Sequence, residues 1–497
     1  MPAWYRDPQV LVNIVATVDA ADLALFGASF KAMETSFGFT PGRLGVLQMW
    51  QSLSYSVSLP VWGVFLPVLG ARYLLCLACL VWAFTTLMTP HVAFFEAQCL
   101  LRIINGAALS GVMPITQAIL ADAVESGRRG AAFGWMQSLH TIARVIVSYA
   151  VISLGDAWAC AYYFIFILTL VMIVLLQKLL PADVGKNLGN KDAPKPARLS
   201  FSFWGNALRV VRKIMRIPTF VILVLQGVAG GTPWQAMGFL NIYYAALGFG
   251  NEQVARITAL TNTGAIFGQV FGGYLGDFAA RKSRLHGRVL MAQLSVMLGI
   301  PAWYIMLSTT SPSTSIGDGA VDSAYSFAIG SGFVFYFVST WVSTGANRPI
   351  CADVVQEPGE RAQIVALWVM IEGVVGSFFG APLIGFISDL NGYDIRAVDA
   401  QQGQNAAILA SALFRLGLVC WGFCFVAWAL MHHTLPSDMR GRAGDNHQGA
   451  SNEDLGSVKL QERAVGLGLG AEEEVLLQGD RVRTAQQMEE DRNLPPA

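Results

Sequence analysis

Charged residues are scarce in this 497-residue sequence, at 13% against the roughly 25% typical of a soluble protein. Lys plus Arg equal Asp plus Glu at 33 each, so the chain carries no net charge. Nucleic-acid binding requires a basic surface, which this balance does not supply. So few charges cannot cover the surface of a soluble chain of this size. The composition therefore excludes a cytosolic enzyme and a nucleic-acid-binding protein.

Cysteine and histidine are also rare and poorly placed for chemistry. Nearly all of the seven cysteines lie inside apolar runs, and the one close pair, Cys76 and Cys79, has no second pair. This spacing argues against a disulfide framework or a zinc site. Among six histidines, His140 is the one deep in an apolar run. The sequence also lacks a Gly-rich ATP-binding loop. We therefore expect no metal, no cofactor and no enzymatic activity.

Long apolar runs are what the sequence has in abundance, with 54% hydrophobic residues and a mean hydropathy of +0.49. A membrane-spanning helix needs about 20 mostly apolar residues. The sequence predicts an all-α membrane protein whose twelve spans lie near 9–30, 45–69, 72–89, 93–120, 131–154, 158–180, 218–247, 253–276, 287–308, 323–347, 363–388 and 406–431.

Polar stretches divide this chain into four parts. We expect an N-terminal six-helix bundle over 1–180, a cytoplasmic linker over 181–217, a C-terminal six-helix bundle over 218–435 and a disordered tail over 436–497. The end of the linker fits a basic amphipathic helix on a membrane surface, and equally an extension of the seventh span. Twenty-one Lys and Arg residues fall in loops on the same side of the predicted membrane as the N-terminus, and the other side has Lys31, Arg43, Arg256 and Arg396. Both termini are therefore predicted to be cytoplasmic.

The two halves of the chain resemble each other at corresponding loops. Ala121-Asp122-Ala123-Val124 after the fourth predicted span matches Ala352-Asp353-Val354-Val355 after the tenth. Gly63 and Arg72 near the end of the second span match Gly273 and Lys282 near the end of the eighth. Repeated halves are a recurring design of transporters that bind their solute between the repeats. We therefore predict two pseudo-symmetric six-helix bundles.

The motifs in these loops resemble those of a known family. Gly273-Tyr274-Leu275-Gly276-Asp277, followed by Arg281-Lys282, is similar to the loop signature of the major facilitator superfamily. Arg102 and Gly106, with Asp122 and Arg129, resemble its fourth-span signature. Asp22 and Gly45-Val46-Leu47-Gln48 make the first half most similar to the spinster-like group, from which it departs at Leu23 and Leu109, whereas Pro67 departs from the superfamily's loop signature. The resemblance implies the major facilitator fold and transport by alternating access.

The loop motifs also suggest a cytoplasmic gate. Glycines permit close helix approach, and acids can pair with arginines in one state and release them in another. The candidate gate residues are Gly63, Arg72, Asp122, Arg129, Gly273, Asp277, Arg281, Asp353 and Arg361. The alternative is that these charges serve only to set the topology.

Polar and ionisable residues within the spans are the candidates for solute or proton binding, because a charge at membrane depth needs water or a partner. They are Asp19, Asp22, Arg102, His140, Arg144, Gln226 and Glu372. Arginine favours carboxylate and phosphate groups. The family resemblance implies that spans one and four line the solute path. Structural roles stay open, including helix register for Arg102 and a pair between Glu372 and Arg415.

These observations predict a secondary active or facilitative transporter of a small organic solute with an anionic group. The spinster resemblance extends this to an amphiphilic, lipid-like solute. Coupling to protons through Asp22 or His140 and uncoupled transport are both open. We expect a monomer surrounded by membrane lipids. The alternative function is a non-transporting membrane receptor or sensor built on a transporter fold.

Overall fold

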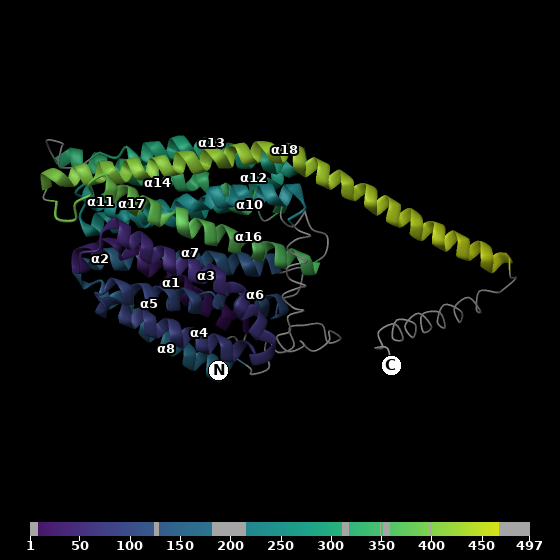
Figure 1. Cartoon of the computed structure of the whole chain (residues 1–497), viewed down its shortest axis with the longest axis horizontal. Helices are drawn as coiled ribbons and strands as arrows, with labels where there is room; N and C mark the ends of the chain where they lie inside the picture. The colour runs from purple at the N-terminus through teal and green to yellow at the C-terminus, as the bar shows by residue number, and fades with distance from the viewer. Residues whose placement is uncertain are drawn as a thin grey trace. The chain divides into compact units, whose positions relative to one another are not determined.

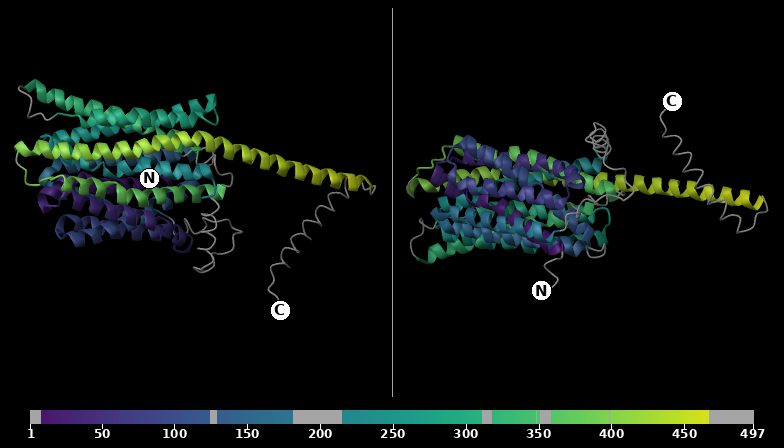
Figure 2. Two further views of the ribbon diagram at one scale, coloured as in Figure 1. Left: turned by 45° about the horizontal axis from the view of Figure 1, so that its top comes forward. Right: turned by 90° about the horizontal axis from the view of Figure 1, so that it is seen from below.

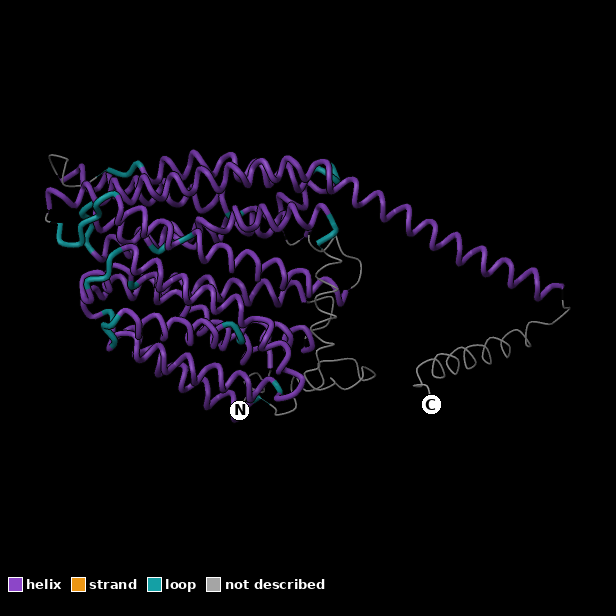
Figure 3. Tube along the Cα trace, in the orientation of Figure 1, coloured by secondary structure: helices purple, strands orange, loops and turns teal. Residues whose placement is uncertain are grey.

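The computed structural model of this chain describes residues 8–123, 129–180, 215–310, 318–347, 349–350, 358–397 and 399–466. Helices are the regular structure in these residues (Figure 3). The chain divides into two compact units, Met1–Leu435 and Pro436–Ala497. Residues 181–214 of the predicted linker, which include most of its candidate amphipathic helix, lie outside the described residues.

The first half of the larger unit contains the helices α1 (Pro8–Ala28), α2 (Phe30–Phe37), α3 (Pro41–Leu69), α4 (Ala71–Met88), α5 (Phe95–Leu109), α6 (Val112–Ala123), α7 (Arg129–Leu154) and α8 (Ala159–Leu179). Local chemistry explains several of their ends. Gly38 takes the left-handed conformation, at φ 66°, that ends α2. Thr40 then caps α3 by accepting from the Arg43 backbone N–H, and Pro41 occupies the first turn.

The second half contains α10 (Pro218–Gly231), a 3-10 turn (Thr232–Ala236), α11 (Phe239–Ala246), α12 (Asn251–Lys282), α13 (Gly287–Leu307), α14 (Asp318–Ser339), a π-helical turn (Ser343–Asn347), α16 (Pro358–Phe379), α17 (Ala381–Leu390) and α18 (Asp399–Gly466). The helices of each half lie together (Figure 1 and the left view of Figure 2). Two six-helix halves make up the fold, which confirms the predicted class.

Nine helices in the described residues are long and apolar enough to cross a membrane, or ten when the bent pair around Ala236 counts as one span. Two more long helices, α3 with 29 residues and α12 with 32, complete the twelve predicted spans. Both contain polar residues such as Gln51 and Asn262. Gln51 donates to Asn105 of α5, and Asn262 donates to the Thr258 carbonyl of its own helix, so both polar groups are satisfied within the fold.

The smaller unit begins at Pro436, where the predicted tail begins. Its backbone is helical as far as Gly466, which differs from the irregular chain that the sequence predicts. This stretch contains good helix formers, including Leu460, Gln461 and Glu462. It has no repeating apolar positions, and their absence is the reason that the sequence predicts an irregular chain. Residues 467–497 lie outside the described residues.

The two halves pack against each other through α3 with α16 and α17, and through α7 with α12. Glycines allow the backbones to come close. A methyl group on Gly45 of α3 would lie 2.6 Å from the Ala381 carbonyl oxygen, and one on Gly385 of α17 would collide with Pro41. Small residues commonly permit such close helix approach in membranes. These contacts place α3 and α7 at the boundary between the halves.

Candidate functional site

A buried polar network occupies the interior of the first half. The Asp22 carboxylate on α1 accepts hydrogen bonds from Thr86 Oγ1 of α4 at 2.5 Å and from Asn105 Nδ2 of α5 at 3.3 Å. Asn105 also donates to Thr85 Oγ1 and accepts from Gln51 Nε2 of α3. The network therefore joins four helices of one half. It places Asp22 within that half rather than at the boundary with the other half.

Arg102 belongs to the same interior. It is 2% exposed and donates to Thr89 Oγ1, just beyond the end of α4. Its guanidinium also lies over the Phe26 ring, 4.8 Å from the ring centre. A desolvated cation–π contact contributes about 2 kcal/mol, which helps to offset the burial of this charge. This arrangement matches the structural alternative in which Arg102 holds the helices in register.

Asp19 lies one turn before Asp22 and is 1% exposed. Neither of its carboxylate oxygens has a hydrogen-bond partner among the described residues. Asp22 and Tyr55 are close enough to interact with it electrostatically. Asp19 and Asp22 therefore both lie in the first half, as the sequence predicts.

His140 and Arg144 lie one turn apart on α7, at the boundary between the halves. His140 is 6% exposed, and its Nε2 has no partner among the described residues. Part of the Arg144 surface is accessible although protein atoms around it desolvate its charge, and the groups acting on it are His140 of its own helix and Tyr336 of α14 in the other half. No described carboxylate acts on Arg144. The structure thus separates Arg144 from the Asp22 and Arg102 network, although the sequence grouped all of them.

Aromatic side chains form a cluster on the second half beside Arg144. Trp234 stacks on Phe335 at 5.8 Å and meets Tyr336 edge-on at 5.7 Å. Trp303 and Trp421 close the cluster behind Phe335. Phe335 is fully buried and serves packing, whereas Trp234 keeps part of its surface accessible. The cluster is therefore mostly buried, with Trp234 as its partly accessible member and Tyr336 as the member that acts on Arg144.

The two remaining predicted residues lie together in the second half. Gln226 of α10 is 1% exposed and donates to Asn347 Oδ1 at 3.2 Å. Glu372 of α16 packs against α10, because a methyl group on Gly227 would lie 3.2 Å from its Oε2. Arg415 is solvent-exposed on α18, and no ion pair between described residues joins it to Glu372.

Contacts between the halves gather at the predicted extracellular end. Asp389 of α17 accepts from Thr40 Oγ1 at 2.9 Å and from the Gly42 backbone N–H at 3.1 Å, at the first turn of α3. Tyr393 donates to Glu34 Oε1 of α2 at 2.6 Å. We call these five residues the cross-half latch. Sequence analysis missed it; the acids at span ends, Glu34 and Asp389, were the available signal.

A second cross-half contact lies at the same end. Tyr149 of α7 donates to Glu252 Oε1 of α12 at 2.7 Å, and Glu252 also pairs with Arg256 at 2.9 Å. Phe30 meets Phe239 edge-on at 5.2 Å, and Asn241 donates to the Gly27 carbonyl. The halves are therefore held together at this end by both polar and aromatic contacts.

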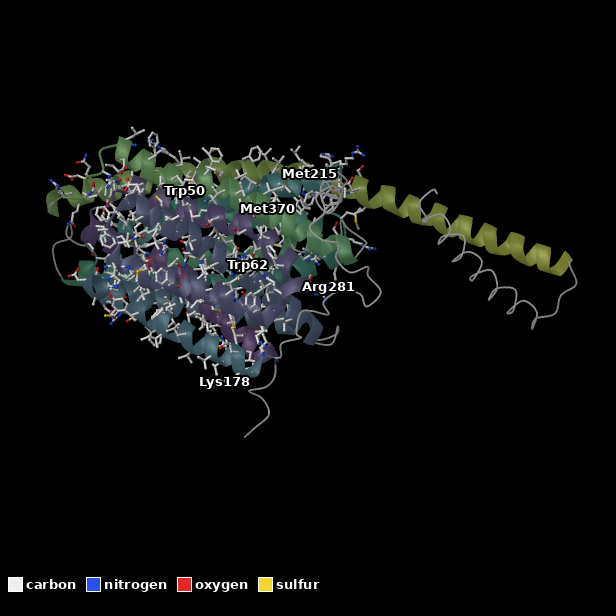
Figure 4. All side chains as sticks on the ribbon, turned by 60° about the horizontal axis from the view of Figure 1, so that its bottom comes forward. Trp50, Trp62, Lys178, Met215, Arg281 and Met370 are labelled. Atoms are coloured by element: carbon white, nitrogen blue, oxygen red, sulfur yellow. The ribbon has the colours of Figure 1, made fainter. Side chains whose placement is uncertain are left out.

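Part of the predicted cytoplasmic gate can be placed. Arg72 donates to the Leu180 carbonyl at 3.4 Å, and Asp277 pairs with Arg288 of α13 at 2.9 Å rather than with Arg281. Gly273 faces open space, whereas a methyl group on Gly276 would collide with Gly345. Figure 4 shows Met215 and Arg281 at one end of the helices, with Trp62 and Met370 between the ends.

The other predicted gate residues contribute no side-chain geometry. Asp353 lies outside the described residues. The side chains of Gly63, Asp122, Arg129 and Arg361 also lie outside the described set, although their backbones are helical. The predicted gate as a whole therefore stays a prediction.

The sequence profile described as the Major Facilitator Superfamily matches residues 12–381. The chain belongs to the major facilitator superfamily. This superfamily consists of transporters rather than enzymes, so the expected family and the expected non-enzymatic function are both confirmed. No curated protein sequence matches the chain significantly.

Solved structures share the same fold. A bacterial homolog of the human lysosomal transporter spinster, in an inward-facing and unoccupied conformation, is 17% identical with a TM-score of 0.67, over 88% of this chain and 99% of that one. The nucleoside transporter NupG is 14% identical with a TM-score of 0.62, over 84% and 99%. A bacterial homologue of the human drug peptide transporters PepT1 and PepT2 is 13% identical with a TM-score of 0.61, over 87% and 99%. Identities this low establish the fold alone.

Proposed function

We propose that this superfamily member transports a small organic anion by alternating access, with Arg144 as the residue that binds the anionic group. The observation that carries the proposal is the position of Arg144. It lies at the boundary between the halves with part of its surface accessible, Tyr336 of the opposite half acts on it electrostatically, and no described carboxylate does. An arginine at membrane depth costs about 3 kcal/mol unless water or an anion meets it.

The surroundings of Arg144 also favour a solute with an apolar body. Trp234 and Tyr336 pack edge-on in the second half, Trp234 keeps part of its surface accessible, and Tyr336 acts on Arg144. Solute sites generally combine apolar surfaces with a few polar groups that fix orientation. Among the solutes left open by the sequence, an organic anion with a planar or aliphatic body fits both features. An amphiphilic anion remains within this class.

The cross-half latch supports a conformation that opens to the cytoplasm. Asp389 and Tyr393 tie α17 and the loop after it to α2 and α3 at the predicted extracellular end. The solved spinster homolog with the same fold is described as inward-facing. With both termini in the cytoplasm, the solute would reach Arg144 from the cytoplasmic side in this state.

Uptake into proteoliposomes tests the proposed function. Radiolabelled organic anions, sugars and lysolipids are compared with and without a pH gradient. Arg144→Ala should lower kcat/KM for a transported anion about 10- to 100-fold, because a hydrogen bond to a charged group contributes about 1.5–3 kcal/mol. Arg144→Lys should retain part of the activity, since it keeps the charge without the planar guanidinium.

Arg415→Ala provides the matched control, because Arg415 is also an exposed span arginine but lies on α18 of the second half, and no described hydrogen bond or ion pair includes it. It should transport like the wild type. Equal uptake by Arg144→Ala and the wild type would remove Arg144 from the site. Transport confined to neutral sugars would refute the anionic solute.

A further inference from the structure

The seventh span is broken near its middle. Its first helix, α10, ends at Gly231, a 3-10 turn covers Thr232–Ala236, and α11 then leaves at an angle of 45°. Gly230, Gly231 and Pro233 explain the change from α-helix to 3-10 turn, because glycine lowers helix propensity and proline removes a backbone donor. The 45° bend follows between Ala236 and Phe239. Such a break is a place where a span can bend at little cost.

The Glu372 carboxyl lies against the helix just before this break. A methyl group on Gly227 would lie 3.2 Å from Oε2, and a methyl group on Gly231 would lie 3.0 Å from Cδ. The two glycines therefore leave the space that the carboxyl occupies. Trp368, one turn earlier on α16, also packs on Gly227, and its buried Nε1 has no partner among the described residues.

Among the described residues, no cation balances a negative charge on Glu372. No ion pair between described residues includes it. The titratable group that acts on it is the Cys424 thiol of α18, which contacts Gln226 of α10 at 3.8 Å. The nearby residue from the first half is Ser56 of α3, which is uncharged. An unpaired carboxylate at membrane depth costs several kcal/mol, and a bound proton removes that charge.

The same segment contacts the first half of the chain. Gln235, within the broken stretch, accepts from Ser52 Oγ of α3 at 3.3 Å. Gly373, the residue after Glu372, packs so closely on Ser56 that a methyl group there would collide with it. A change in the bend of the seventh span therefore acts directly on the contacts between the halves.

We propose that Glu372 is a proton-binding site that controls the bend of the seventh span and, through it, the opening between the halves. The neutral carboxylic acid stays packed against Gly227 and Gly231, which stabilises the conformation described above. The ionised carboxylate leaves this packing for water, which it reaches because the side chain is only partly buried. This inference rests on the proposed alternating-access function and adds the group that couples it to protons.

Spin labels provide a test that requires no solute, with the proton as the only ligand. Arg43→Cys and Asn391→Cys place labels on exposed positions of opposite halves at the latch end. All cysteines except the buried Cys79 and Cys424 are replaced by serine, and the full chain is placed in lipid nanodiscs. The label-to-label distance is measured from pH 5 to pH 9. The short-distance population should dominate at acid pH and fall as the pH rises.

Glu372→Gln should keep the short distance at every pH, because the neutral amide cannot ionise. Glu372→Asp should keep the pH-dependent change in distance, with its midpoint at a different pH. This variant provides the test if Glu372→Gln does not fold. A wild-type midpoint in either variant, or a wild-type distance that does not change with pH, would overturn the proposal. So would a transition abolished by Asp389→Asn or Asp22→Asn but not by Glu372→Gln. A failure of the transport function itself would appear separately, as absent uptake by the wild type in proteoliposomes.

Discussion

Removal of the Asp389 carboxylate should open the predicted extracellular end. Asp389 accepts from Thr40 Oγ1 and from the Gly42 backbone N–H, so it caps the N-terminus of a helix that belongs to the other half. A capping side chain contributes about 1 kcal/mol, and a negative charge near a helix N-terminus adds about 0.3–1 kcal/mol. Asp389 is exposed, and exposed charges contribute at the low end of such ranges.

We therefore expect Asp389→Ala to weaken the closed state by about 1 kcal/mol, or about five-fold in its population relative to the open state. The shift is partial because the hydrogen bond between Tyr393 and Glu34 remains. Spin labels at Arg43→Cys and Asn391→Cys measure it directly at constant pH. The open, long-distance population should rise about five-fold.

Asp394→Asn is the matched control for this experiment. Asp394 is an acid at the same end, and its Oδ1 accepts from the Arg396 backbone N–H within its own loop at 2.9 Å. It makes no described hydrogen bond or ion pair with the first half, so the distance distribution should not change. Equal shifts in both variants would refute the latch, since they would indicate an effect of local charge alone. An unchanged distribution in Asp389→Ala would refute the cross-half cap.

Two further predictions follow from the same structure. Tyr393→Phe should enlarge the open population about 10-fold, because a hydrogen bond to a charged acceptor contributes about 1.5–3 kcal/mol. Burial and the Glu34 carboxylate raise the pKa of Tyr393, so its hydroxyl stays protonated. The difference between the variant and the wild type should therefore be constant from pH 5 to pH 9. A difference that vanishes within that range would contradict the assignment. Gly276→Ala should lower the free energy of unfolding in detergent by about 1–3 kcal/mol, because its methyl group would collide with Gly345. Gly273→Ala, which faces open space, should cost nothing, and equal losses in the two variants would contradict the close packing.

The family signature illustrates what a linear pattern can and cannot predict. Gly273 and Gly276 occupy equivalent-looking positions in the motif, and the sequence assigned a gate role to Gly273. The structure places Gly276 against Gly345, whereas a methyl group on Gly273 would meet no described atom. The two positions lie three residues apart, and which one meets a neighbouring helix depends on how α12 is rotated. That rotation is set by packing with α14.

The charged residues at membrane depth show the same limit. Asp22, Arg102 and Arg144 all belong to the first half, as predicted, but they have different surroundings. Asp22 and Arg102 lie in a network with α4, and Arg144 lies at the boundary beside Tyr336. A residue's depth in the membrane can be counted along the chain, whereas the direction it faces requires the positions of the other helices.

By itself the sequence determined the membrane class, the twelve spans, the repeated halves and the family, because apolar run length and loop motifs are local properties of the chain. Tertiary structure decided which of the rare charges face each other. It placed Asp389 at the first turn of α3, 347 residues away along the chain. It also placed Glu372 on the glycines before the break in the seventh span. Both contacts arise between helices distant in sequence, and their energy depends on distances of a few ångströms that no local pattern encodes.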